Sequence, residues 1–175
     1  LTRQYKLGRP DDPETTLGPL VKPSAAAFAR EQVEDALARG ATAHIDSSLF
    51  PAHDPSGAYM APQILTGVDH SMRVMTEETF GPVVGIQKTF SDEEAVGLMN
   101  DSEFGLTASV FTRDIERAVE LGEQIETGTF FTNRCDYLDP ALAWTGVKHS
   151  GAGYALSPLG FEALTQPKSY HLKLS

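Results

Sequence analysis

The stretch VVGIQKTFSDEEAVGLMNDSEFGLTASVFTRD, residues 83–114, indicates the fold class of the chain. It opens with residues 83–90, which are rich in β-branched and aromatic side chains and predict a strand. Ser91 can then cap a helix, and Glu94 stands at the third helical position, where its carboxylate can complete a capping box. Residues 106–112 form a second run of strand type. Strand, helix and strand in this order are typical of a parallel βαβ unit.

The same alternation continues beyond this stretch. Asp114 can cap a second long helix, which we expect to end at Gly128, and residues 129–132 again have strand composition. The positions of this helix that we expect to face inward are Ile115, Ala118, Val119 and Ile125. The succession predicts an α/β fold with an open, mostly parallel sheet and flanking helices.

The segment before residue 83 is also regular. Residues 24–39 predict a helix, because Ser24 can cap it, apolar side chains recur near helical spacing, and Gly40 stands at the usual stop. Residues 41–46 and 59–68 predict two short extended segments. A helix and two short strands are thus also predicted before the βαβ pattern.

Composition narrows the classes of function. The chain has 175 residues, 41% hydrophobic and 22% charged, as expected for one ordinary globular domain. Its net charge of -10 disfavours nucleic acid and anionic membranes as partners. One cysteine can form no internal disulfide, which favours a cytoplasmic location. The start at Leu1 rather than at a methionine predicts a processed, cleaved or cut polypeptide.

Residues 77–82, Glu-Glu-Thr-Phe-Gly-Pro, mark a loop at the entrance to the first strand of the pattern. Gly81 and Pro82 form a break, because glycine accepts backbone angles that other residues avoid and proline fixes its own. Polar side chains on a loop held by a rigid scaffold are a common way to build a ligand site. The alternative is an ordinary solvated turn with a buried phenylalanine.

Residues 78–82, Glu-Thr-Phe-Gly-Pro, resemble the glutamate-x-phenylalanine-glycine-proline motif of the aldehyde dehydrogenase superfamily. Residues 100–114 are similar to the family's segment of asparagine, aromatic-glycine-leucine and alanine-serine-valine-phenylalanine-threonine. Residues 128–133 are similar to its strand ending in asparagine, and 143–151 to its turn of phenylalanine-glycine-glycine-x-lysine-x-serine-glycine. The resemblance covers nearly the whole chain and implies part of that family's catalytic domain.

The resemblance also implies a chemistry. In the family a cysteine thiolate attacks the aldehyde to give a thiohemiacetal, hydride passes to NAD or NADP, and water cleaves the thioester with help from a glutamate base. By resemblance, Glu78 hydrogen-bonds the nicotinamide ribose and Phe80 packs beside the nicotinamide. The nucleophile and base precede this motif in the family. We therefore expect no catalytic residue in this chain and no activity from the chain alone, and the choice of NAD or NADP stays open.

The chain's only thiol, Cys135, invites comparison with a catalytic nucleophile. Its place after the Glu78 motif opposes that role, and so does Asp136, which disfavours the thiolate, although Arg134 favours it. The five histidines show no metal-ligand spacing, so we expect no metal site.

By resemblance, residues 134–144 form a wall of the tunnel through which the small-molecule aldehyde enters. Trp144 replaces the family's common phenylalanine there, and Thr145 replaces its first glycine. The alternative is that these side chains serve packing alone, and the identity of the aldehyde stays open. The predicted substrate contacts are Cys135, Tyr137, Leu138 and Trp144.

The end of the chain predicts assembly. Residues 168–174 alternate polar and apolar side chains, as an edge strand does. In the family this strand joins an intersubunit sheet, which implies a homodimer or homotetramer. We therefore expect residues 1–165 to belong to the catalytic domain and 166–175 to form an oligomerisation strand. The alternative is a non-catalytic oligomerisation or interaction module with the same fold.

Overall fold

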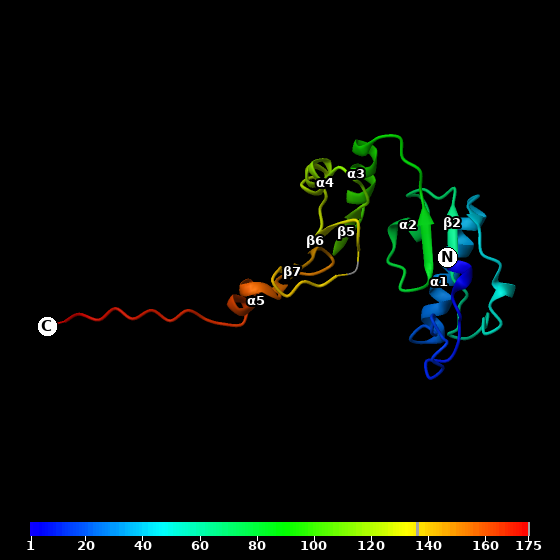
Figure 1. Ribbon diagram of the computed structural model, residues 1–175, viewed down its shortest axis with the longest axis horizontal. Coiled ribbons are helices and arrows are strands. Elements are labelled where there is room, and N and C mark those ends of the chain that lie inside the picture. The colour runs from blue at the N-terminus through cyan, green and yellow to red at the C-terminus, as the bar shows by residue number, and fades with distance from the viewer. Residues whose placement is uncertain (136, 175) are drawn as a thin grey trace. The chain divides into compact units, whose positions relative to one another are not determined.

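The structure is a computed structural model, and it describes residues 1–135 and 137–174 (Figure 1). Asp136, expected to disfavour the Cys135 thiolate, and Ser175, the end of the predicted terminal strand, lie outside the described residues. The chain divides into two compact units, Leu1–Lys88 and Thr89–Ser175. The predicted boundary after residue 165 remains a prediction.

The first unit is built on a three-stranded sheet. Its central strand, β2 (Gln63–Thr66), pairs antiparallel with β1 (Thr42–Ala43) and parallel with β3 (Val83–Ile86). The short helix α2 (Arg73–Thr76) lies between the two parallel strands in the chain, so this part is a βαβ unit. The unit also contains two 3-10 helices, η1 (Thr2–Gln4) and η2 (Ser47–Leu49).

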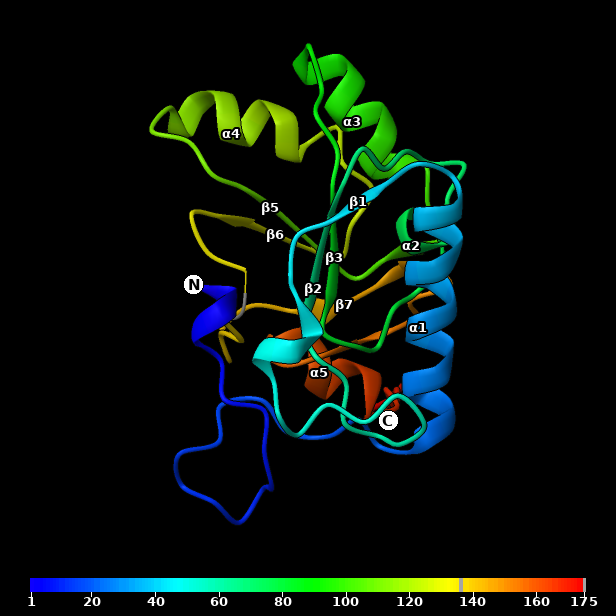
Figure 2. The ribbon, with the colours of Figure 1, turned by 90° about the vertical axis from the view of Figure 1, so that its right-hand side faces the viewer.

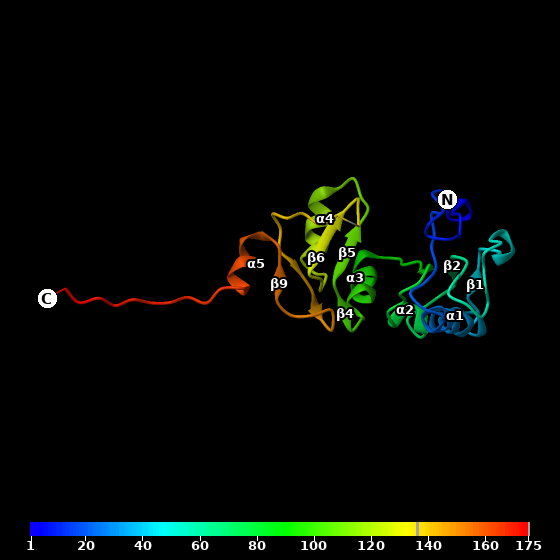
Figure 3. The same cartoon turned by 90° about the horizontal axis from the view of Figure 1, so that it is seen from below.

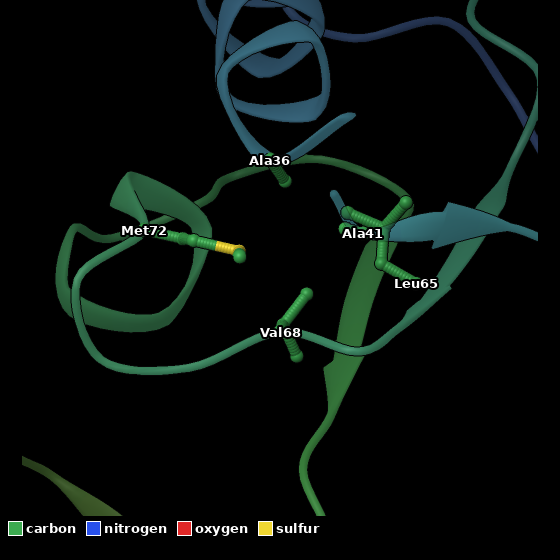
Figure 4. Packing of buried hydrophobic residues seen from close by; sticks show 5 residues of the cluster. All are labelled: Ala36, Ala41, Leu65, Val68 and Met72. Atoms are coloured by element: carbon green, nitrogen blue, oxygen red, sulfur yellow. The ribbon is translucent and has the colours of Figure 1, made fainter. Parts of the chain in front are cut away.

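The long helix α1 (Pro23–Ala38), which confirms the helix predicted over 24–39, runs beside this sheet (Figure 2). Ser24, predicted to cap it, lies inside its first turn, and the N-cap residue is Lys22. Gly40 follows it with a φ of 100°, as expected for a glycine that ends a helix. A Cβ at Gly85 in β3 would lie 2.4 Å from Sδ of Met75, so the glycine makes room for α2 on the sheet. Figure 4 shows the buried cluster that joins these elements, made of Ala36, Ala41, Leu65, Val68 and Met72.

The second unit contains the rest of the predicted alternation. Helix α3 (Asp92–Asn100) comes first, and the strands β5 (Thr107–Val110) and β6 (Thr129–Thr132) pair in parallel with helix α4 (Ile115–Gly122) between them in the chain. The Asp114 carboxylate accepts a backbone hydrogen bond in the first turn of α4, as a helix cap does. This βαβ unit confirms the predicted alternation over residues 106–132. The unit predicted from the strands 83–90 and 106–112 is wrong, because β3 pairs with β2 and β5 pairs with β6.

Shorter elements complete this unit. β4 pairs with β8 and β7 with β9, both antiparallel, and the last helix lies beside β9 (Figure 3). Residues 166–174 contain neither helix nor strand and are exposed, so the predicted oligomerisation strand remains a prediction. The short elements are β4 (Phe104–Gly105), β7 (Trp144–Thr145), β8 (Val147–Lys148), β9 (Tyr154–Ala155) and α5 (Ser157–Ala163).

The predicted α/β class, with open sheets and flanking helices, is confirmed. The strands are shorter than expected, and antiparallel pairs accompany the two parallel ones. None of the described helices combines the length and the apolar composition needed to cross a bilayer.

Helix α4 departs from its prediction, because it ends at Gly122 and not at Gly128. The side chain of Asn100 accounts for the early end. Its Oδ1 accepts the Glu126 backbone N–H (2.8 Å), and its Nδ2 donates to the Gln124 carbonyl (2.8 Å), so these backbone groups bond outside the helix.

The predicted inward face of α4 is only half correct. Ala118 and Ile125 are buried, but Ile115 and Val119 are each 56% exposed. The described part of this unit therefore packs on the helix face that carries Ala118. The neighbouring apolar face, with Ile115 and Val119, is left exposed.

Candidate functional site

The Glu-Glu-Thr-Phe-Gly-Pro loop lies between α2 and β3. Its last residue enters the sheet, because the Gln63 backbone N–H donates to the Pro82 carbonyl (2.8 Å). A Cβ at Gly81 would lie 3.1 Å from Cβ of Ala29, so the glycine lets the loop press closely on α1. At the other end, the Glu77 backbone N–H donates to the Arg73 carbonyl of α2 (2.8 Å), so both ends of the loop are fixed by regular elements.

Gln32 of α1 anchors the middle of the loop. Its side chain is 0% exposed, which is unusual for a polar residue and requires hydrogen-bond partners. The Thr79 hydroxyl donates to Oε1 of Gln32 (2.7 Å), and Nε2 of Gln32 donates to the Glu77 carboxylate (3.4 Å). One buried amide thus ties down the residues immediately before and after Glu78.

Arg73 of α2 strengthens this anchor. Its Nε donates to both carboxylate oxygens of Glu77 (2.9 and 3.0 Å), and its guanidinium lies 5.3 Å from the centre of the Phe28 ring. The bond from Arg73 holds the pKa of the Glu77 carboxyl below its ordinary value, although partial burial opposes this shift. The pair therefore contributes stability above the ordinary carboxyl range, and this is lost as pH falls through the lowered pKa.

Glu78 and Phe80 point out of the anchored loop. Glu78 is exposed, and its carboxylate makes no hydrogen bond within the described part of the chain. Phe80 is 82% exposed, so the alternative of a buried phenylalanine in a solvated turn is wrong. A free carboxylate can accept hydrogen bonds from neighbouring hydroxyls, and an exposed ring offers a flat apolar face. The two predicted cofactor residues are therefore presented together on the first unit.

In the second unit, three segments that resemble the family's motifs meet at glycines. These are residues 100–114, 128–133 and 143–151. The Gly128 N–H donates to the Gly105 carbonyl (3.0 Å), and the Gly105 N–H donates to the Ser150 hydroxyl (2.9 Å). A Cβ at Gly128 would lie 1.8 Å from the Thr145 carbonyl oxygen. Residues 105, 128, 145 and 150, which we call the glycine crossing, are thus in direct contact.

Asn133 fixes the start of the predicted tunnel loop. Its side chain pairs with both backbone groups of Thr112, accepting from the N–H (2.9 Å) and donating to the carbonyl (2.8 Å). Its φ of 58° lies in the left-handed region, which asparagine tolerates better than most residues. The loop over 134–144 therefore leaves the sheet at a fixed point and in a fixed direction.

A pocket of about 170 Å³ lies between this loop and β6. Tyr137 and Trp144, two of the predicted substrate contacts, both line it, and the Arg134 guanidinium stacks 4.1 Å from the centre of the Tyr137 ring. Its described lining consists of Thr129, Phe130, Phe131, Arg134, Tyr137, Asp139, Leu142, Ala143, Trp144 and Leu156. We call this the ring pocket.

The other two predicted contacts lie elsewhere on the loop. Cys135 is exposed and Leu138 is 55% exposed, and neither lines the ring pocket. The predicted cofactor residues belong to the first unit and the predicted substrate residues to the second. Among the described residues, no group of three or more histidine, cysteine, aspartate or glutamate side chains could hold a metal ion.

Sequence reasoning missed the residues that support the site. Gln32 stands three residues after Ala29 and four before Ala36, so it shares their buried face of α1. A single polar residue at such spacing was the available signal. Thr129 and Leu156 of the ring pocket gave no signal, because chain folding alone brings them to the loop.

Comparisons with known proteins all point to one protein family. The model of the aldehyde dehydrogenase family matches residues 1–170. The succinate-semialdehyde dehydrogenase (NADP(+)) of Deinococcus radiodurans is 39% identical over 161 residues, which cover 92% of this chain and 33% of the relative. Vanillin dehydrogenase of a Pseudomonas strain is 38% identical over 162 residues, covering 92% and 32%.

A solved structure agrees with these relatives. Betaine aldehyde dehydrogenase from Staphylococcus aureus, in complex with NAD+, superposes with a TM-score of 0.80 at 32% identity, covering 93% of this chain and 32% of that one. The chain thus spans about a third of the length of the curated relatives that it matches.

Proposed function

This chain belongs to the aldehyde dehydrogenase family, and from that premise we propose that it forms part of an NAD(P)-dependent enzyme that oxidises an aldehyde to a carboxylic acid. The observation that carries the proposal is the anchored loop. Glu77 is bound by the Arg73 guanidinium, and Thr79 is bound by the buried Gln32 amide. Glu78, which lies between them, and Phe80, which follows, are both exposed. Such an arrangement suits a pair of side chains that bind a ligand from outside the unit.

Each residue of the loop has a role in this proposal. The Glu78 carboxylate accepts hydrogen bonds from the ribose hydroxyls next to the nicotinamide, and Phe80 packs beside the nicotinamide ring. Bound NAD(P) supplies the hydride acceptor. Gln32 and Arg73 hold the loop and so keep the Glu78 carboxylate in its orientation. Neither of these two side chains has to touch the cofactor itself. The relatives named above use NADP(+) or NAD+, so either cofactor fits this role.

The nucleophile and base are expected on a part of the enzyme that this chain does not contain. We therefore expect the purified chain to show no aldehyde-dependent formation of NADH or NADPH. The names of the relatives point to different aldehydes, succinate semialdehyde and vanillin, and family membership alone does not choose between them. We also propose a cytoplasmic location, which the single cysteine favours.

A chimera tests the proposal. This chain would replace the matching third of the Deinococcus radiodurans relative, and assembly would be checked by size-exclusion chromatography and circular dichroism. We expect the chimera to reduce NADP+ in the presence of an aldehyde. Glu78→Gln should raise the KM for NADP+ about tenfold, because a charged hydrogen-bond acceptor is lost, a change of about 1.4 kcal/mol.

The matched control is Glu116→Gln on α4, an exposed glutamate far from the loop in sequence, which should leave the KM for NADP+ unchanged. An assembled chimera without activity would contradict the dehydrogenase proposal. An active chimera whose KM is the same with Glu78→Gln would remove Glu78 from the cofactor site.

A further inference from the structure

A groove of about 660 Å³ lies between β9 and α5 in the second unit, and we call it the α5 groove. It is about four times as large as the ring pocket of about 170 Å³. Tyr154 and Ala155 line it from β9, and Phe161 and Leu164 line it from α5 and the residue after that helix. Its described lining carries no charged side chain, and Phe161 and Leu164 are 75% and 87% exposed. A contiguous apolar surface of this kind marks a site where another chain binds.

The walls of the α5 groove are fixed. The Ser157 N–H donates to the Pro140 carbonyl (2.9 Å), which ties the start of α5 to the tunnel loop. Leu156, which also lines the groove, has a φ of 62°, in the left-handed region. A leucine there is strained, and such strain persists only where the surrounding structure imposes it, often at ligand clamps. The groove therefore has a defined shape.

Residues 168–174 of the chain have the chemistry that this groove requires. Their apolar side chains, Tyr170, Leu172 and Leu174, are at least 72% exposed, and in an extended chain they share one face. Tyr170 and Leu174 are then about 13 Å apart, and α5, with seven residues, is about 10 Å long. The apolar face of the segment thus matches the groove in polarity and in length.

The segment leads away from the groove of its own copy. Only residues 165–167 separate it from Leu164, at the edge of the groove. Residues 165–174 contain no turn, and Figure 1 shows them as an extended chain that runs away from α5. Pro167 supports this conformation, because a proline favours an extended residue before it. A segment that fills the groove therefore comes from another copy.

We propose that two copies of the chain exchange their terminal segments, so that residues 168–174 of each copy lie in the α5 groove of the other. Among the described strands β9 pairs with β7 alone, so its other edge can form backbone hydrogen bonds with the segment. The apolar face of the segment then packs on Phe161 and Leu164. The exchange is reciprocal, as in a symmetric dimer that swaps an identical element. It is independent of the dehydrogenase proposal, because it uses no residue of the cofactor loop.

Disulfide trapping between two kinds of copy tests the exchange. Both kinds carry Cys135→Ser, which removes the only native thiol; one also carries Leu172→Cys and the other Phe161→Cys. Mild oxidation of the mixture should give a dimer joined between positions 161 and 172, identified by mass spectrometry of the digested protein. In the matched control, Phe111→Cys takes the place of Phe161→Cys. Phe111 is 70% exposed in the same unit but does not line the groove, so this mixture should give little product. Equal yields, or no disulfide between positions 161 and 172, overturn the proposal.

A chain that carries both Leu172→Cys and Phe161→Cys, again with Cys135→Ser, distinguishes exchange from folding back. We expect disulfides that join two copies, seen as a covalent dimer on a non-reducing gel. A covalently closed monomer would show that the segment lies in the groove of its own copy, and would overturn the exchange.

Phe161→Ser tests the groove without a cross-link. Because this side chain is already 75% exposed, the variant should keep its circular dichroism spectrum but self-associate at least about tenfold more weakly. Phe111→Ser, the control, should change the dissociation constant by about twofold at most. Sedimentation equilibrium measures both variants. Equal dissociation constants would assign the groove to another occupant, such as the part of the enzyme that this chain does not contain, and would overturn the exchange. An unaltered chain that is monomeric overturns it as well, but leaves the dehydrogenase proposal standing, whereas an inactive chimera leaves the exchange standing.

Discussion

At the scale of single residues, glycines decide where the backbone can cross. At Gly128 a Cβ would meet the Thr145 carbonyl oxygen at 1.8 Å, a separation that no side chain can relieve, because the neighbour is backbone. Gly97 in the middle of α3 has nothing within 4 Å of such a Cβ. The same chemical change should therefore have opposite effects at the two positions.

We expect Gly128→Ala to lower the unfolding free energy of the second unit by about 2 kcal/mol or more, because strands must separate to admit the methyl group. Gly97→Ala should raise it by about 0.5 kcal/mol or more, since alanine loses less backbone entropy in a helix. Urea denaturation followed by Trp144 fluorescence measures both. If the two variants unfold at the same urea concentration, the close approach at Gly128 is not present in solution.

At the scale of elements, helix α1 positions the loop that presents Glu78 and Phe80. The hydrogen bonds between this helix and the loop come from one side chain, Gln32, which bonds to Glu77 and Thr79 from the buried face of the helix. A loop anchored through a single buried amide should loosen when the amide is removed, while the helix remains intact.

Gln32→Leu should therefore increase backbone hydrogen exchange at residues 77–80 and cost about 1–3 kcal/mol, because buried partners lose their hydrogen bonds. Glu34→Leu, an exposed change on the same helix, is the control and should leave exchange in the loop as it is. Protection of residues 77–80 that is equal in the two variants would show that Arg73 alone holds the loop.

Element types were predictable from the sequence, because capping residues and hydrophobic periods act locally. Asp114 and the strand over 129–132 are examples. The end of α4 was not predictable, since the Asn100 side chain that ends it lies 26 residues before its partner Glu126. The two predicted cofactor residues come from a local motif, whereas the ring pocket depends on Leu156, which only the tertiary fold brings to the loop.

At the scale of the whole molecule, the chain exposes apolar side chains that an assembly could cover. In the terminal segment, Tyr170, Leu172 and Leu174 are 72%, 80% and 92% exposed. They alternate with polar residues, so in a paired edge strand all three would lie on the same face of the sheet. We retain the proposal that this segment pairs with a second copy of the chain.

Removal of residues 166–175 should therefore convert a dimer or larger species into a monomer, as measured by light scattering coupled to size-exclusion chromatography. Because residues 166–174 lie outside the described helices and strands, the stability of both units should be unchanged. A matched variant with Tyr170, Leu172 and Leu174 replaced by serine keeps the length and should also be monomeric. If the 175-residue chain is already monomeric, the assembly role is contradicted.

The same terminal segment has a consequence for the lifetime of the protein in a cell. Exposed terminal segments that no helix or strand ties down are sites where proteolysis concentrates. A copy whose segment is unpaired would be degraded, whereas pairing would hide the cleavage sites. The cellular abundance of this protein would then be set by how quickly newly made copies find one another, even if every copy folds equally well.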